Sequence, residues 1–177
     1  RKYASNDQPW CHYFVTWCFR TAGYSVAMNG SSQDPIRNSD WIKIKDPLPG
    51  CVIVLSKNGG GNKNDPDGAV RGHSMFYIGP HTGGRSESWY VATGNNRNKH
   101  GQSCVRVKDY SLADSGGKSF VGFFIPKVAL ADMEKAAGRK ATEIKKTDTF
   151  NLTSTDGGGT EGVVEGAATA AAATPSR

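Results

Sequence analysis

Residues 8–23 constrain the fold more than any other part of the chain, because they predict a single amphipathic helix. Pro9 is tolerated in a first turn, whose amides have no partner within the helix, and Gly23 supplies a stop. Trp10, Phe14 and Trp17 recur at spacings of three and four residues, and Cys18 follows. We therefore expect this side of the helix to be buried against the rest of the domain.

Cys11 falls in the first turn of that helix. Unpaired amides and the positive end of the helix dipole favour negative charge there, which suits a nucleophilic thiol and the oxyanion that it generates. The simpler alternative is that Cys11 is a buried small hydrophobic residue. Just before it, the Gln8 amide either donates a hydrogen bond to the oxyanion or helps to cap the helix, and capping is the commoner role of such residues.

Five short apolar runs follow and predict strands over 51–55, 72–79, 87–92, 103–107 and 120–126. Connections of hairpin length favour an antiparallel sheet. Residues 39–44 predict a short helix and residues 128–147 a charged one. The fold class is therefore α+β, with the N-terminal helix packed on a roughly five-stranded antiparallel sheet.

Composition divides the chain into three parts: a domain over 1–126, the charged helix over 127–147, and a low-complexity linker or tail over 148–177 rich in Gly, Thr and Ala. Residues 1–126 carry 15 Lys and Arg against 9 Asp and Glu, whereas residues 127–177 carry seven of each. The basic excess suits an anionic polymer such as a wall glycan or a nucleic acid. No interleaved aromatic and basic motif is present, so nucleic acid ranks last.

The four cysteines follow neither a disulfide framework nor a metal-binding spacing, and we expect mostly free thiols. No zinc-binding histidine pattern occurs, and no metal is expected. The chain shows neither a signal peptide nor an apolar run long enough to enter a membrane. Because it begins with Arg1, we expect it to be part of a larger polypeptide or delivery assembly.

A thiol nucleophile needs a base, and His73 is the best placed of the four histidines. His12 follows Cys11 directly and points about 100° away from it on a helix. His81 and His100 lie in Gly-rich loops, whereas His73 opens an apolar strand. The next strand ends in Gly94 and two asparagines, so an amide of Asn95, or of its rival Asn96, is expected to orient the imidazole.

These pieces together resemble the CHAP/NlpC-type cysteine amidases and endopeptidases of peptidoglycan, which are papain-like α+β domains. The matching residues run in order from 8 to 126: Pro9-Trp10-Cys11, Phe14-Val15, Trp17-Cys18, Pro49-Gly50, Gly72-His73, Gly94-Asn95 and Pro126. The resemblance implies that Cys11 is the nucleophile, His73 the base and Asn95 the orienting residue, with no cofactor. Family members often carry aspartate where this chain has Cys51.

The resemblance implies a peptidoglycan hydrolase, either an N-acetylmuramoyl-L-alanine amidase or a peptide-stem endopeptidase, acting at the bacterial cell wall or periplasm. A phage lysin or tail-associated lytic domain fits the internal start and the tail. The alternatives are a delivered antibacterial effector amidase, a thiol deamidase or transferase acting on a protein, and a non-catalytic glycan-binding module.

Overall fold

The computed structural model describes residues 10–57, 72–81, 88–97, 100, 103–112 and 118–149. Gln8, in front of the first helix, lies outside the described residues. The elements, in chain order, are α1 (Cys11–Thr21), α2 (Asp34–Arg37), β1 (Trp41–Ile44), β2 (Val52–Lys57), β3 (Gly72–Pro80), β4 (Ser88–Arg97), β5 (Ser103–Ser111), β6 (Lys118–Pro126), the 3₁₀-helix η2 (Lys127–Ala129), α3 (Leu130–Ala137) and β7 (Glu143–Ile144).

The described strands form one antiparallel sheet in the order β5-β4-β3-β2-β6-β1-β7. The α+β class, the antiparallel sheet and the N-terminal helix are confirmed, but the described strands number seven, so the sheet does not match the expected papain-like, five-stranded arrangement. Residues 41–44, expected to be helical, form β1 and pair with β6 from Trp41↔Pro126 to Ile44↔Phe123. All four residues of β1 are buried, so the strand lacks the polar and apolar alternation by which half-buried strands are recognised.

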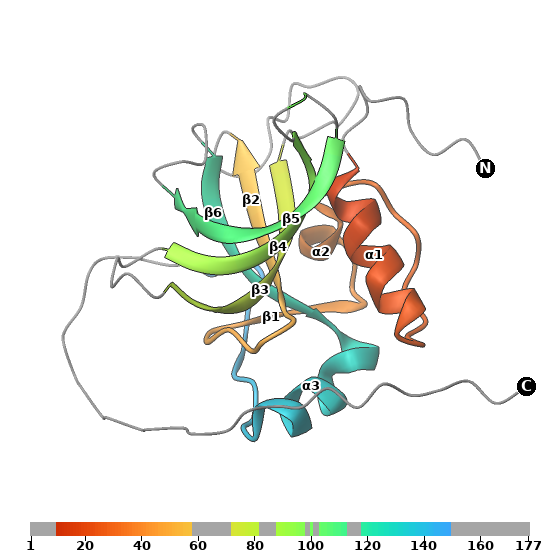
Figure 1. The fold of residues 1–177 in the computed structure, drawn as a ribbon. Helices are drawn as coiled ribbons and strands as arrows, with labels where there is room; N and C mark the ends of the chain where they lie inside the picture. Colours follow the sequence, from red (N-terminus) through yellow and green to blue (C-terminus); the bar gives the residue numbers. More distant parts are fainter. Residues whose placement is uncertain are drawn as a thin grey trace, which may run out of the picture.

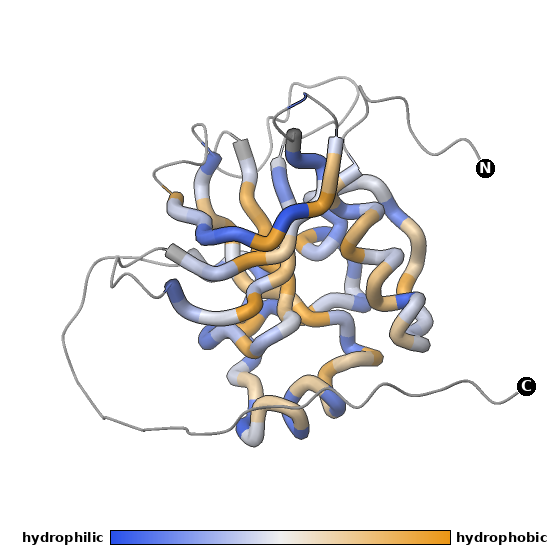
Figure 2. Tube along the Cα trace, in the orientation of Figure 1, coloured by the Kyte–Doolittle hydropathy of each residue, from blue (hydrophilic) through white to orange (hydrophobic). Residues whose placement is uncertain are grey.

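The sheet curls strongly toward one of its faces (Figure 1). Trp89 on β4 contacts Phe120 and Phe123 on β6, with ring centroids 5.1 and 5.7 Å apart, although β3 and β2 lie between those strands. In a flat sheet, three strand spacings would separate them by roughly 14 Å. The aromatic cluster therefore fills a concave face, and Figure 2 shows the hydrophobic residues concentrated in the central strands.

Helix α1 covers the opposite, convex face against β3 and β4. Phe14 and Phe19 meet Phe76 of β3, with centroids 5.9 and 5.4 Å apart. The fully buried stripe of the helix is Cys11, His12, Val15, Thr16 and Phe19. The stripe expected from the sequence was therefore misplaced, and Trp17 is 55% exposed. The buried side includes two polar residues, His12 and Thr16. Hydrophobicity alone would place both of these residues in solvent.

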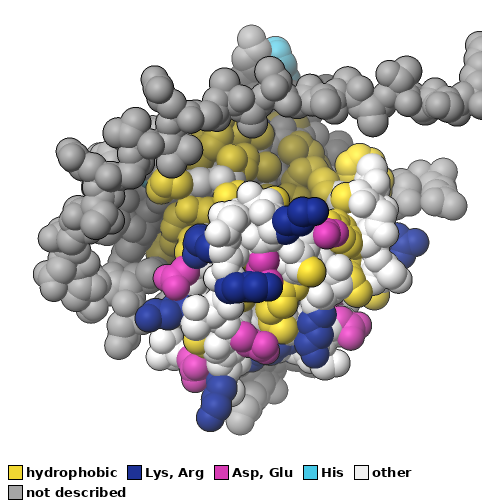
Figure 3. All heavy atoms as spheres, turned by 90° about the horizontal axis from the view of Figure 1, so that it is seen from below, with side chains coloured by type: hydrophobic (Ala, Val, Ile, Leu, Met, Phe, Trp, Pro, Cys, Tyr) yellow, Lys and Arg dark blue, Asp and Glu magenta, His cyan; other side chains and the backbone are white. Residues whose placement is uncertain are grey.

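The charged helix expected over 128–147 is shorter and ends at Gly138, whose φ of 64° lies in the left-handed region. The chain then returns to the sheet as β7, which pairs with β1. Ala129, Leu130 and Met133 pack against the core. Figure 3 shows this end of the molecule, where basic and acidic side chains are interspersed. Among the described helices, none is long and apolar enough to span a membrane.

Candidate active site

The backbone pairing between β3 and β4 stops short of one end of both strands. Their described backbone pairing runs from Pro80↔Trp89 to Phe76↔Ala92 and goes no further, although both strands continue. Beyond that point β3 pairs only with β2, as at Leu55↔His73, and β4 pairs only with β5, across an irregularity between Thr93 and Asn96. We call residues 72–75 of β3 and 93–97 of β4 the β3–β4 split.

The start of α1 lies against both sides of this split. On the β4 side, a Cβ added to Gly94 would lie 2.7 Å from the Trp10 ring, and the Trp10 indole Nε1 donates to Ser103 Oγ of the neighbouring strand β5 at 2.9 Å. On the β3 side, His12 Nδ1 lies 3.2 Å from Ser74 Oγ. Cys11 is the residue between these two contacts and the first residue of α1, as the sequence predicted.

His73 reaches across the split to β4. Its Nε2 lies 2.7 Å from the hydroxyl oxygen of Thr93, which is fully buried. That hydroxyl donates to the Gly94 carbonyl at 3.2 Å and accepts from Asn96 Nδ2 at 3.3 Å. In the tautomer with the proton on Nε2, the Thr93 oxygen accepts the hydrogen bond from His73. The remaining nitrogen, Nδ1, then holds the lone pair that a general base needs.

The environment of His73 keeps the imidazole neutral. Burial is the largest cause, and the positive charges of Lys118 and Lys108 add to it; together they lower the pKa of His73 to about 4. At neutral pH this side chain is therefore uncharged, and in this environment it binds a proton less readily than an ordinary histidine does.

Cys11 and His73 approach the split from different faces of the sheet. Ser74 and Phe76 contact α1 on the convex face, and strand alternation directs His73 to the concave face. Among the contacts of the described residues, none joins Cys11 to His73.

The asparagines play parts that the sequence did not predict. Asn95 Oδ1 accepts from Ser103 Oγ at 3.3 Å, and Ser103 in turn holds Trp10. Asn95 has a φ of 58°, in the left-handed region that asparagine tolerates. Asn96 donates to Thr93. The described hydrogen-bond partner of His73 on β4 is thus Thr93, which sequence reasoning missed.

The remaining cysteines and histidines lie in less suitable places. All four cysteines are free thiols. Burial raises the pKa values of the Cys18 and Cys51 thiols, which disfavours the thiolate at both. His81 Nε2 lies 3.7 Å from Asp109 Oδ1 on β5. Within the described part of the chain, no cluster of three or more His, Cys, Asp and Glu could hold a metal ion.

Comparisons of the chain with models of protein families, with curated proteins and with solved structures find no match.

Proposed function

We propose that this protein is a thiol hydrolase that cleaves amide bonds in bacterial peptidoglycan, with Cys11 as the nucleophile and His73 as the base. The observation that carries the proposal is the β3–β4 split. The residues on either side of Cys11 contact β4 and β3 there, and His73 lies within hydrogen-bond distance of Thr93 in the same region.

The chemistry follows from these groups. The Cys11 sulfur attacks the amide carbonyl carbon while the thiol proton passes to Nδ1 of His73. The oxyanion lies at the start of α1, where backbone amides without helical partners donate to it. His73 then gives its proton to the leaving amine as the C–N bond breaks. Water, deprotonated by the same nitrogen, hydrolyses the thioester and restores the thiol.

Peptidoglycan is the proposed substrate because of the motif order between residues 8 and 126 and because of the charge. The basic excess lies entirely within residues 1–126, the part that holds the site, and a basic surface attracts anionic wall polymers. A domain that acts on this substrate would be a lytic domain of a phage particle, or one delivered to the wall by a larger assembly.

The test is digestion of purified sacculi by the wild type and by Cys11→Ala, followed by mass spectrometry of the soluble muropeptides. An amidase would release stem peptides with a free L-alanine amino terminus, whereas an endopeptidase would release shortened, uncrosslinked stems. We expect one of these product sets from the wild type and none from Cys11→Ala.

Absence of soluble products from the wild type would overturn the proposed substrate. The same preparation incubated with a protein substrate would then reveal deamidation or acyl transfer as mass shifts. Equal release by Cys11→Ala and the wild type would overturn the thiol mechanism.

A further inference from the structure

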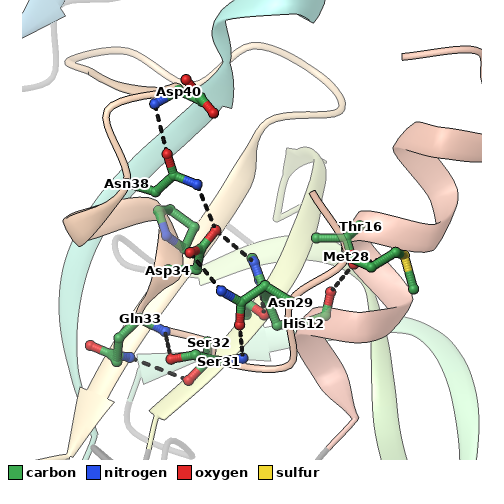
Figure 4. Close-up of polar contacts among 12 residues, drawn as sticks. His12, Thr16, Met28, Asn29, Ser31, Ser32, Gln33, Asp34, Asn38 and Asp40 are labelled. Carbon is green, nitrogen blue, oxygen red and sulfur yellow. Dashed lines mark hydrogen bonds and ion pairs between the residues drawn. The ribbon is translucent and has the colours of Figure 1, made fainter. Parts of the chain in front are cut away.

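Three polar side chains join α2, α1 and β3 beneath the surface. His12 and Ser74 are fully buried. His12 Nδ1 lies 3.2 Å from Ser74 Oγ, and its Nε2 lies 3.8 Å from Asp34 Oδ2. Figure 4 shows the Asp34 carboxylate between His12 and the amides of Asn29 and Asn38. We call Asp34, His12 and Ser74 the buried polar network.

Asp34 is held as an anion. Asn29 Nδ2 donates to its Oδ1 at 2.8 Å, and Asn38 Nδ2 lies 3.4 Å from its Oδ2. Burial would raise the pKa of Asp34, but its interactions with His12 and Asn38 outweigh burial and lower it. In the tautomer with the proton on Nε2, that proton lies on the Asp34 side of the ring and Nδ1 accepts from the Ser74 hydroxyl.

An apolar residue at position 12 would be the simpler choice for a buried helix face. A buried imidazole loses its hydration, and no hydrogen-bond partner satisfies His12 Nε2 within the described residues. Buried polar groups of this kind are often replaceable by well-packed hydrophobic ones at no loss of stability. Stability alone therefore does not account for the network.

The place of the network in the chain suggests what it does. His12 directly follows Cys11, and Ser74 directly follows His73. Their hydrogen bond fixes the residue after the proposed nucleophile to the residue after the proposed base. Asp34, anchored on α2, sets the direction of the imidazole that makes this bond.

We propose that the buried polar network positions Cys11 over the β3–β4 split, with His12, Ser74 and Asp34 as positioning residues. The proposal rests on the proposed function for its effect on turnover, but the placement of the thiol is measurable without a substrate. The three side chains are not a serine nucleophile with its base, because Ser74 and His12 expose no surface to a substrate carbonyl.

The test compares Ser74→Ala with Thr16→Val. Thr16 is also fully buried on α1, but its hydroxyl contacts the carbonyls of His12 and Tyr13 within α1 and the sulfur of Met28, none of which belongs to β3. Both variants remove one buried hydroxyl, and only Ser74→Ala removes the contact between α1 and β3. The readout is the rate of iodoacetamide alkylation of Cys11 divided by that of Cys18 in the same sample, from peptide mapping.

We expect Ser74→Ala to lower this ratio roughly fivefold, the effect of one buried hydrogen bond, and Thr16→Val to leave it unchanged. A looser helix would alter both cysteines together and would not move the ratio selectively. Equal ratios in the two variants would overturn the proposal. His12→Asn, whose amide oxygen can still accept from Ser74, should keep more of the wild-type ratio than His12→Leu; the reverse order would also overturn it.

Turnover on sacculi, measured in parallel, separates the two proposals. A selective fall in the Cys11 ratio in a protein that releases no muropeptides supports the positioning network and refutes the substrate. An unchanged ratio in a protein that hydrolyses sacculi refutes the network and leaves the proposed function standing.

Discussion

The two halves of β3 differ in what holds them. From Phe76 to Pro80 the strand pairs with β4, and Tyr77 makes an edge-to-face contact with Phe123, with ring centroids 5.9 Å apart. From Gly72 to Met75 it pairs only with β2, and side chains make the other contacts: His73 to Thr93 and Ser74 to His12. One half contributes packing and a continuous ladder, whereas the other replaces a ladder with directed polar contacts. Stability and the proposed chemistry therefore occupy different halves of one strand.

The largest expected effect is on turnover at the polar half. His73→Ala should reduce muropeptide release by roughly 10²–10⁴-fold, the usual loss when a general base is removed. His100→Ala is the control, because His100 is exposed and lies outside the split. Melting temperatures of both variants should stay near that of the wild type. A normal rate in His73→Ala would remove the distinction between the two halves.

The pH dependence of stability should also trace to His73. Its pKa is about 4 in the folded protein against an ordinary value of 6.5. Between these values the unfolded chain binds more protons at this position, so the free energy of unfolding should rise with pH and level off above about 6.5. Over this pH range, the titration of His73 should change the free energy of unfolding by about 3 kcal/mol. Urea unfolding of wild type and His73→Gln from pH 4 to 7.5 measures it; parallel curves for the two proteins would contradict the low pKa.

A substitution in the ladder half should have the opposite character. Val91 pairs with Tyr77 and is fully buried. Val91→Ala should lower the free energy of unfolding by roughly 2 kcal/mol through lost apolar burial and the cavity left behind. The folded molecules should retain wild-type turnover at temperatures well below the melting point. A loss of turnover comparable to that of His73→Ala would show that the halves are not separate.

The smallest expected effect concerns the hydroxyl that orients the base. Thr93→Val keeps the shape of the side chain but removes the acceptor for His73 Nε2, and it should reduce kcat roughly five- to tenfold, as expected for one buried hydrogen bond. Thr93→Ser should restore most of the rate. Asn95→Ala is the comparison, because the amide of Asn95 contacts Ser103. A larger loss in Asn95→Ala than in Thr93→Val would return the orienting role to Asn95.

The helix and the central strands were predictable because their signals are local. Gly23, with a φ of 95°, follows α1 closely, and Cys11 begins it. Strand β1 was missed because a strand buried on both faces carries no period of two. Within the site, Cys11 and His73 can be recognised from the sequence, whereas Thr93 and His12 cannot. Their roles depend on where pairing between β3 and β4 ends and on partners far along the chain, which no local pattern encodes.

The measurement that tests the central claim most directly is the alkylation rate of each cysteine in the wild type and in His73→Ala. Cys11 is only 2% exposed, whereas Cys18 and Cys104 are partly exposed, so accessibility alone would make Cys11 slower than both. If the split brings the Cys11 thiol to the His73 base, Cys11 should react faster than Cys18 and Cys104, and His73→Ala should slow Cys11 alone. Reaction in order of exposure, with Cys11 unaffected by His73→Ala, would contradict the account.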